Sequence, residues 1–323
     1  MLRPPRVVVP HPRPDPSEPL FSTHLLFPPD PSRNGLYGST AIGHDGGVHP
    51  VVVVCFVGVL LGIVLALRWG HLAFEPPPPA VRVTFGEQAK RGLWYLDVLM
   101  IGGVSAGLLA AGAGGRLAMR LLAVTAGDGA QGRITEADEV VGKITVGGTI
   151  GFVVFGGLFA GLAAAAIYLV LRRWLPAGRP GAFVLAGLLL VSLGAHVDPL
   201  RSDNPDFNLV GPDWLAVSAF TALAFLHTFV LFAVMARVSR SLPLFAATPR
   251  VALAYLPLLL LVPASVIGVA LVVVMLAGAA VSTRPAVRRF WAQRRLLVAG
   301  RTLIAVASLI FLPSFIAATV DIL

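Results

Sequence analysis

The sequence predicts an all-α protein, a polytopic transmembrane helix bundle with about seven membrane segments. Of its 323 residues, 56% are hydrophobic and only 13% are charged, and the mean hydropathy is +0.83. These values lie outside the usual range for soluble domains. The apolar runs are continuous and far longer than the roughly 10 residues of a membrane β-strand. Because lipid offers no water to the backbone, such runs are expected to be helices.

The net charge of +9 comes almost wholly from arginine, since Lys90 and Lys143 are the only lysines. Basic loops of membrane proteins lie against anionic lipid, so we expect the lipid bilayer as partner and not nucleic acid. A second copy or another membrane protein is left open as a further partner. The lone Cys55 excludes an intrachain disulfide, and we expect no metal and no cofactor. The arginine- and alanine-rich composition favours a bacterial cell membrane as the location.

Three regions are expected along the chain. Residues 1–48 are rich in proline and histidine without apolar periodicity, which predicts a disordered tail. Residues 49–82 hold a first span, at 51–67, and a proline-rich spacer. Residues 83–323 form the main transmembrane domain. The abrupt change of composition near Val83 leads to the hypothesis that the native chain starts there.

The second and third spans, 93–114 and 145–171, are rich in glycine. Glycines spaced four apart let two helices approach closely in a membrane, so we expect these spans to pack directly against each other. The pairs with this spacing are Gly103 and Gly107, Gly147 and Gly151, and Gly157 and Gly161. Asp97 is expected near the membrane surface, in reach of water, with a proton relay as the alternative.

The polar connector between these spans, 128–143, carries several acids. We expect a solvated face there and not a cation site, because the glycine-containing loop of a calcium site is absent. Thr135 is expected to cap a short amphipathic helix. Before the connector, Arg116 and Arg120 share one helical face, so they are candidates for contacts with phosphate headgroups or with the connector's acids.

The fourth and fifth spans, 181–197 and 214–235, flank a loop with Asp-Pro, Asn-Pro and Gly-Pro turns. It holds the best candidate for a polar site in the chain, although its spacing matches no known ligand pattern. We expect its residues first to cap helices and form turns, with binding of a divalent metal or a cationic substrate as the alternative. The candidate residues are His196, Asp198, Arg201, Asp203, Asp206 and Asp213.

His227 lies within the fifth span, either as a functional group or bonded to a neighbouring carbonyl. The next segment, 251–281, would be about 46 Å long as one helix, too long for one span and too short for two. Pro257 and Pro263 can break it. An amphipathic arginine stretch, 284–295, and a final span, 302–320, follow.

Two topologies remain open for 251–281. If the segment crosses, the basic residues divide ten against ten between the two sides; if it re-enters, six crossings remain and the division is fifteen against five. We therefore keep both.

The function expected first is that of a structural or interaction protein of the membrane, without turnover. A small-solute transporter or channel is one alternative. The other is an interfacial enzyme on lipid-linked substrates, with acids near Asp198 and phosphate held by Arg116 and Arg120.

Overall fold

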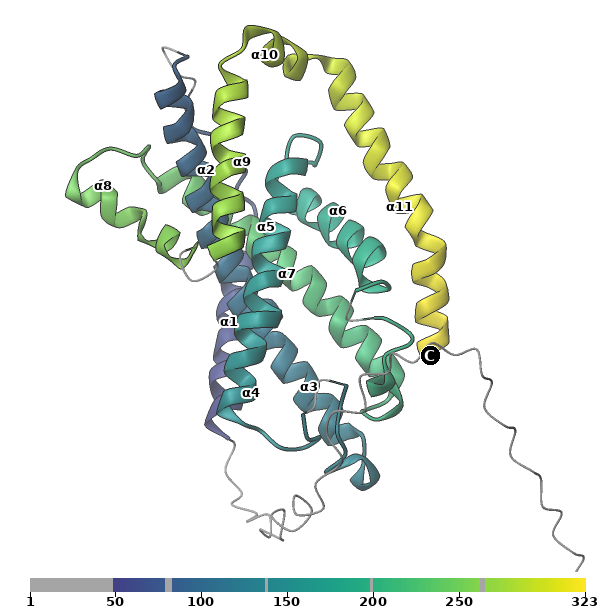
Figure 1. The fold of residues 1–323 in the computed structure, drawn as a ribbon. Helices are drawn as coiled ribbons and strands as arrows, with labels where there is room; N and C mark the ends of the chain where they lie inside the picture. Colours follow the sequence, from purple (N-terminus) through teal and green to yellow (C-terminus); the bar gives the residue numbers. More distant parts are fainter. Residues whose placement is uncertain (1–48, 79–82, 137–138, 198–199, 262–264) are drawn as a thin grey trace, which may run out of the picture. The chain divides into compact units, whose positions relative to one another are not determined.

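The computed structural model of the protein describes residues 49–78, 83–136, 139–197, 200–261 and 265–323. Over these ranges the chain is helical apart from its loops and one isolated antiparallel bridge, between Ile134 and Val140 (Figure 1). The predicted all-helical class is confirmed for this part of the chain. The expected tail, 1–48, lies outside the described residues.

Among the described residues, five helical runs are long and apolar enough to cross a membrane. A sixth is obtained if α9 (Ser265–Ser282) and α10 (Pro285–Ala292), which are bent by 95° at the break between them, are taken as one span. The seven expected crossings are therefore not confirmed. The five runs are Pro50–Trp69, Phe85–Thr125, Val146–Leu171, Asp213–Ser241 and Arg294–Ile322.

Three of these runs are the single helices α1, α7 and α11. The other two are continuous series of helices, α2–η3–α3 and α4–η5–α5, in which η3 and η5 are π-helical. The bounds of the composite runs are α2 Phe85–Ala106, η3 Gly107–Gly112, α3 Ala113–Thr125, α4 Val146–Gly151, η5 Phe152–Leu158 and α5 Phe159–Leu171. Short 3-10 turns in the loops are η4 (Asp128–Ala130) and η7 (Pro205–Asn208).

Two expected spans differ from the prediction. The fourth is a shorter apolar helix, α6 (Arg179–Leu189) continued by the π-helical η6 (Leu190–Gly194). The segment 251–281 is split into α8 (Pro249–Ala254), the 3-10 helix η8 (Leu256–Leu261) and α9. The first break precedes Pro257, because a proline lacks the N–H of a helix interior and disfavours helical geometry in the residue before it. Pro263 lies outside the described residues.

The run α2–η3–α3 is the central helix of the bundle. At 1.5 Å per residue its 41 residues measure about 60 Å, twice the roughly 30 Å of bilayer hydrocarbon. It does not end at Gly114 as expected, because Gly114 and Gly115 lie against Leu223 and Phe152 of neighbouring helices and the chain stays helical to Thr125. Its most apolar stretch is 67% buried, against 6% for α11.

The central helix meets the third span backbone to backbone. A Cβ added at Gly157 would lie 2.8 Å from the carbonyl oxygen of Gly107, and one added at Gly103 would lie 2.9 Å from that of Gly161. The direct packing expected of these two spans is thus present. We call these four residues the glycine contact. Gly147 and Gly151 take no part in it, since a Cβ added at either has no heavy atom within 4 Å.

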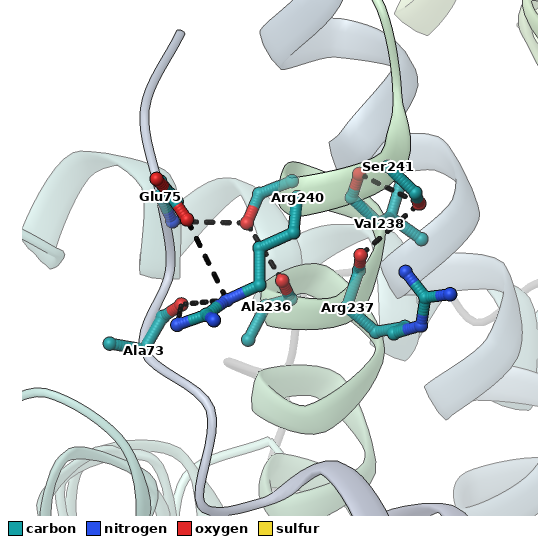
Figure 2. A network of polar contacts seen from close by, with 8 residues as sticks. Ala73, Glu75, Ala236, Arg237, Val238, Arg240 and Ser241 are labelled. Atoms are coloured by element: carbon teal, nitrogen blue, oxygen red, sulfur yellow. Dashed lines mark hydrogen bonds and ion pairs between the residues drawn. The ribbon is translucent and has the colours of Figure 1, made fainter.

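Residues 50–78 pack into the same bundle. On α1, Gly58 faces Ala113, and Gly62 faces Val230 and Leu109. The extended segment after α1 then lies along the end of α7, where the backbone N–H of Glu75 donates to the Ser239 hydroxyl over 3.0 Å. Figure 2 shows Arg240 donating to the Ala73 carbonyl oxygen, at 3.2 Å, with its guanidinium 3.8 Å from the Glu75 carboxylate.

Connector residues 135 and 139 form a turn. Thr135 and Glu139 exchange backbone and side-chain hydrogen bonds of 2.9–3.2 Å. The predicted helix cap at Thr135 is therefore wrong, because the chain turns back on itself at this residue and pairs Ile134 with Val140.

The glycine contact predicts an asymmetry between two glycines of one helix. Gly157→Ala should lower the free energy of unfolding by about 1–3 kcal/mol, because the added methyl meets backbone that has no room to move. Gly151→Ala is the matched control and should be neutral or stabilising, since alanine favours a helix and the space is open. Thermal unfolding in detergent measures both, and equal effects would contradict the contact.

Candidate functional site

The most unusual ionisable group in the described chain is Asp97. It lies on α2, it is fully buried, and its neighbours Trp94 and Val98 are buried with it. Neither carboxylate oxygen has a hydrogen-bond partner among the described residues. The expectation that Asp97 reaches water near the surface is wrong. The start of α2 is packed among other segments, so the carboxylate is enclosed by protein.

A pocket of about 210 Å³ lies along the face of α2 that carries Asp97. Residues three, four and seven positions after a helical residue share its face, and here these are Met100, Ile101 and Val104. All three line the pocket, together with Ser105 and Pro257. The pocket is thus lined by one hydroxyl and apolar side chains, and Asp97 lies about one helical turn before it on the same face of α2.

The wall opposite α2 comes from η8. Pro257 of η8 lines the pocket, and the buried Tyr255 comes two residues before it. The Tyr255 hydroxyl donates to the Pro243 carbonyl oxygen over 2.8 Å, and the Trp94 indole donates to the Leu242 carbonyl oxygen over 2.9 Å. These two bonds tie the chain after α7 to both walls of the pocket.

Ser105 also stands at the centre of a Gly-x-Ser-x-Gly sequence, from Gly103 to Gly107. In hydrolases this pattern forms a sharp turn between a strand and a helix that exposes the serine. Here the five residues lie in the continuous central helix, and two of the glycines belong to the glycine contact. The pattern therefore serves packing, and Ser105 is a wall residue of the pocket.

The polar site expected between the fourth and fifth spans is only partly assembled. Arg201 donates to the Glu136 carboxylate of the connector, over 2.7 Å to one oxygen, and its Nε lies 2.8 Å from Asp203. Asp206 accepts the backbone N–H of Glu136 over 2.9 Å. These contacts join the loop to the connector at the protein surface, where Asp203 is largely exposed. We call the group of Glu136, Arg201, Asp203 and Asp206 the surface clasp.

The other members of that prediction lie elsewhere. His196 packs edge-on against Phe311, with ring centroids 5.6 Å apart. Asp213 occupies the first turn of α7, where a negative charge is favourable. Asp198 lies outside the described residues. Among the residues that are described, no three His, Cys, Asp or Glu side chains are grouped so as to hold a metal ion.

Two arginines of α3, Arg116 and Arg120, bind neutral protein groups. Arg116 donates to the Thr149 hydroxyl over 3.0 and 3.2 Å, and Arg120 donates to the Gly142 carbonyl oxygen over 3.1 Å. Together they fasten α3 to the start of the third span and to the end of the connector.

A second buried ionisable group is His227 on α7, whose Nε2 has no hydrogen-bond partner among the described residues. The sequence already places His227 inside the membrane, because it stands in the middle of an apolar run. For Asp97 the sequence predicts a position at the membrane surface, because it is only the fifth residue of the expected span. Its position in sequence gave no sign that later segments would cover it.

Comparison with known proteins adds no relationship: no family model, no curated protein and no solved structure matches the chain.

The surface clasp predicts only a small contribution to stability. Arg201→Gln and Glu136→Gln should each lower the free energy of unfolding by about 1 kcal/mol or less, because exposed ion pairs are screened by water. The double variant should lose no more than the sum of the two. A coupling above about 2 kcal/mol in this cycle would show that the pair is part of a more tightly organised site.

Proposed function

We propose that the protein is an integral membrane transporter of a small solute, in which Asp97 gains and loses a proton as the solute moves. The observation that supports this proposal is the complete burial of Asp97 without a hydrogen-bond partner among the described residues. Ionisable residues inside membrane helices are rare and costly, and they commonly belong to ion pathways and proton relays.

A proton fits this site better than a metal cation. An ionised carboxylate in apolar surroundings costs several kcal/mol unless a proton or cation compensates it. A hard cation requires about six oxygen ligands. The pocket offers the Ser105 hydroxyl among Met100, Ile101, Val104 and Pro257, whose side chains have no oxygen. The same apolar wall favours a small solute that is itself largely apolar.

The interrupted segment next to Asp97 supports transport as well. Sites of secondary transporters are often lined by discontinuous helices, because the breaks allow one wall to move against the rest. Here the wall opposite α2 is Pro257 of η8, and the helix before it, α8, ends at Ala254. Movement of this wall would change the access of water to Asp97.

We also propose that residues 251–281 enter the membrane and leave it on the same side. The chain then crosses six times, with α6–η6 (Arg179–Gly194) as the crossing beside the five long runs. Pro257 lies beside Ile101 and Val104, deep along the central helix, whereas Met275 of α9 lies beside Gly92, near its start. Both flanks reach one end of the bundle, since Leu242 contacts Trp94 and Leu296 contacts Trp174. Figure 1 shows α9 beside α2, followed by α10 and α11.

A structural or interaction role is a second candidate, favoured by the glycine contact, which joins two spans rigidly without any transport site. An interfacial enzyme has less support, because Arg116 and Arg120, the expected phosphate ligands, donate to Thr149 and Gly142.

Replacing Asp97 distinguishes the first two functions. Cells lacking the gene are complemented with wild type, Asp97→Asn or, as control, the exposed Asp203→Asn, and solute uptake is profiled with and without a proton gradient. Transport predicts an uptake defect that wild type and Asp203→Asn restore and Asp97→Asn does not, although this near-isosteric variant folds normally. Full restoration by Asp97→Asn would contradict the proposal. An unchanged uptake profile in the deletion strain would favour the structural role.

The six-crossing topology is tested with single cysteines. After Cys55→Ala, cysteines are introduced at the exposed positions Pro243, Ala292 and Gly129, and an impermeant thiol reagent is added to sealed vesicles of known orientation. Pro243 and Ala292 should react from the same side, and Gly129 of the connector from the other. Labelling of Pro243 and Ala292 from opposite sides would establish a full crossing by 251–281.

A further inference from the structure

We propose that the arginine-rich end of the bundle binds the headgroups of anionic phospholipids, chiefly through α10 and the first turn of α11. This proposal is independent of the transport function. It concerns the surface at which the chain meets the membrane and not the pocket beside Asp97.

Contacts between distant segments define this end. The Trp174 indole donates to the Leu296 carbonyl oxygen over 3.1 Å, and Arg173 donates to that of Gln293 over 3.3 Å. Those bonds place the end of α5 beside the start of α11. Arg179 donates to the Leu67 carbonyl oxygen over 3.4 Å, so the end of α1 is joined to the start of α6. The start of α2 and the end of α7 also lie at this end, because Trp94 donates to Leu242 and Arg240 donates to Ala73.

The charges of the described residues divide very unevenly between the two ends. The end defined above has fifteen basic residues and two acids, Glu75 and Glu87. The opposite end, with the connector and the loop before α7, has five basic residues and seven acids. The fifteen basic residues are Arg68, Lys90, Arg91, Arg172, Arg173, Arg179, Arg237, Arg240, Arg250, Arg284, Arg288, Arg289, Arg294, Arg295 and Arg301.

The helix α10 has the geometry of an interfacial helix. It is bent by 95° from α9, so it runs across the direction of that helix. It carries Arg288 and Arg289 beside two exposed aromatic side chains, Phe290 at 52% and Trp291 at 48%. Arginine with large aromatic residues on a short amphipathic helix is typical of a segment whose rings enter the acyl boundary while its charges meet the headgroups.

The arginines of α10 and of its flanks are not neutralised within the described part of the chain. All five between Arg284 and Arg295 are exposed, and none forms an ion pair with a described residue. At the opposite end, by contrast, Arg201 is paired with Glu136 and Asp203. Unpaired cations beside a membrane attract its anionic lipids, by about 1 kcal/mol for each residue near the surface. The ligand is therefore a phospholipid headgroup with net negative charge.

The test uses Trp291 as a probe beside the arginines. The full chain is placed in phosphatidylcholine vesicles containing a fraction of brominated phosphatidylglycerol or of brominated phosphatidylcholine, and quenching of tryptophan fluorescence is compared. A Trp291→Phe variant measures the signal of the other four tryptophans, which is subtracted. We expect the anionic lipid to quench Trp291 several-fold more than the neutral one, and this preference to fall at high ionic strength.

Matched variants establish which charges are responsible. Arg288→Gln with Arg289→Gln should remove most of this several-fold preference, because each arginine near the surface contributes about 1 kcal/mol. The control removes two exposed charges at the opposite end, Arg133→Gln with Lys143→Gln, and should leave the preference unchanged. Equal quenching by the two lipids in the wild type, or an equal loss in both double variants, would overturn the proposal. For any variant whose tryptophan fluorescence is itself altered, native mass spectrometry compares the numbers of bound anionic and neutral lipids instead.

Discussion

The arrangement of this bundle depends on the close approach of two backbones at Gly103, Gly107, Gly157 and Gly161. In lipid, helices gain little by hiding apolar side chains from a solvent that is itself apolar, so close packing has to supply the attraction. Side chains at these four positions would separate the helices. The contact fixes the third span against the central helix, and α1, α7 and α9 pack around the remaining faces of that helix.

This packing also makes the ionised form of Asp97 energetically costly. With α5, α7 and the chain after α7 held against α2, no water reaches the carboxylate, and no described donor compensates it. A protein that only needed a stable bundle would be served as well by an apolar residue there. The presence of an acid at Asp97, near a pocket and an interrupted segment, is the physical reason for proposing a proton-dependent function for this residue.

The sequence was most informative where the determinant is local. Uncharged runs predicted the helical class, the bounds of α1 and of the third span to within two residues, and the start of α7, whose end lies six residues further on than expected. The four-residue spacing included all four glycines of the contact. The sequence was least informative where contacts with distant segments determine the burial or the partner of a residue. The burial of Asp97 depends on residues about 150 positions later, and the partner of Arg201 is 65 residues earlier. The continuation of the central helix past Gly114 likewise depends on packing and not on local preference.

We propose that Asp97 carries a bound proton while it is enclosed in the bundle. Infrared spectroscopy of the reconstituted protein measures this directly, because a protonated carboxyl group has a carbonyl stretching band that the carboxylate lacks. The account predicts such a band at neutral pH in the wild type and its loss in Asp97→Asn, with no change in the amide bands of the helices. A spectrum of Asp97 that is that of a carboxylate at neutral pH would contradict the account.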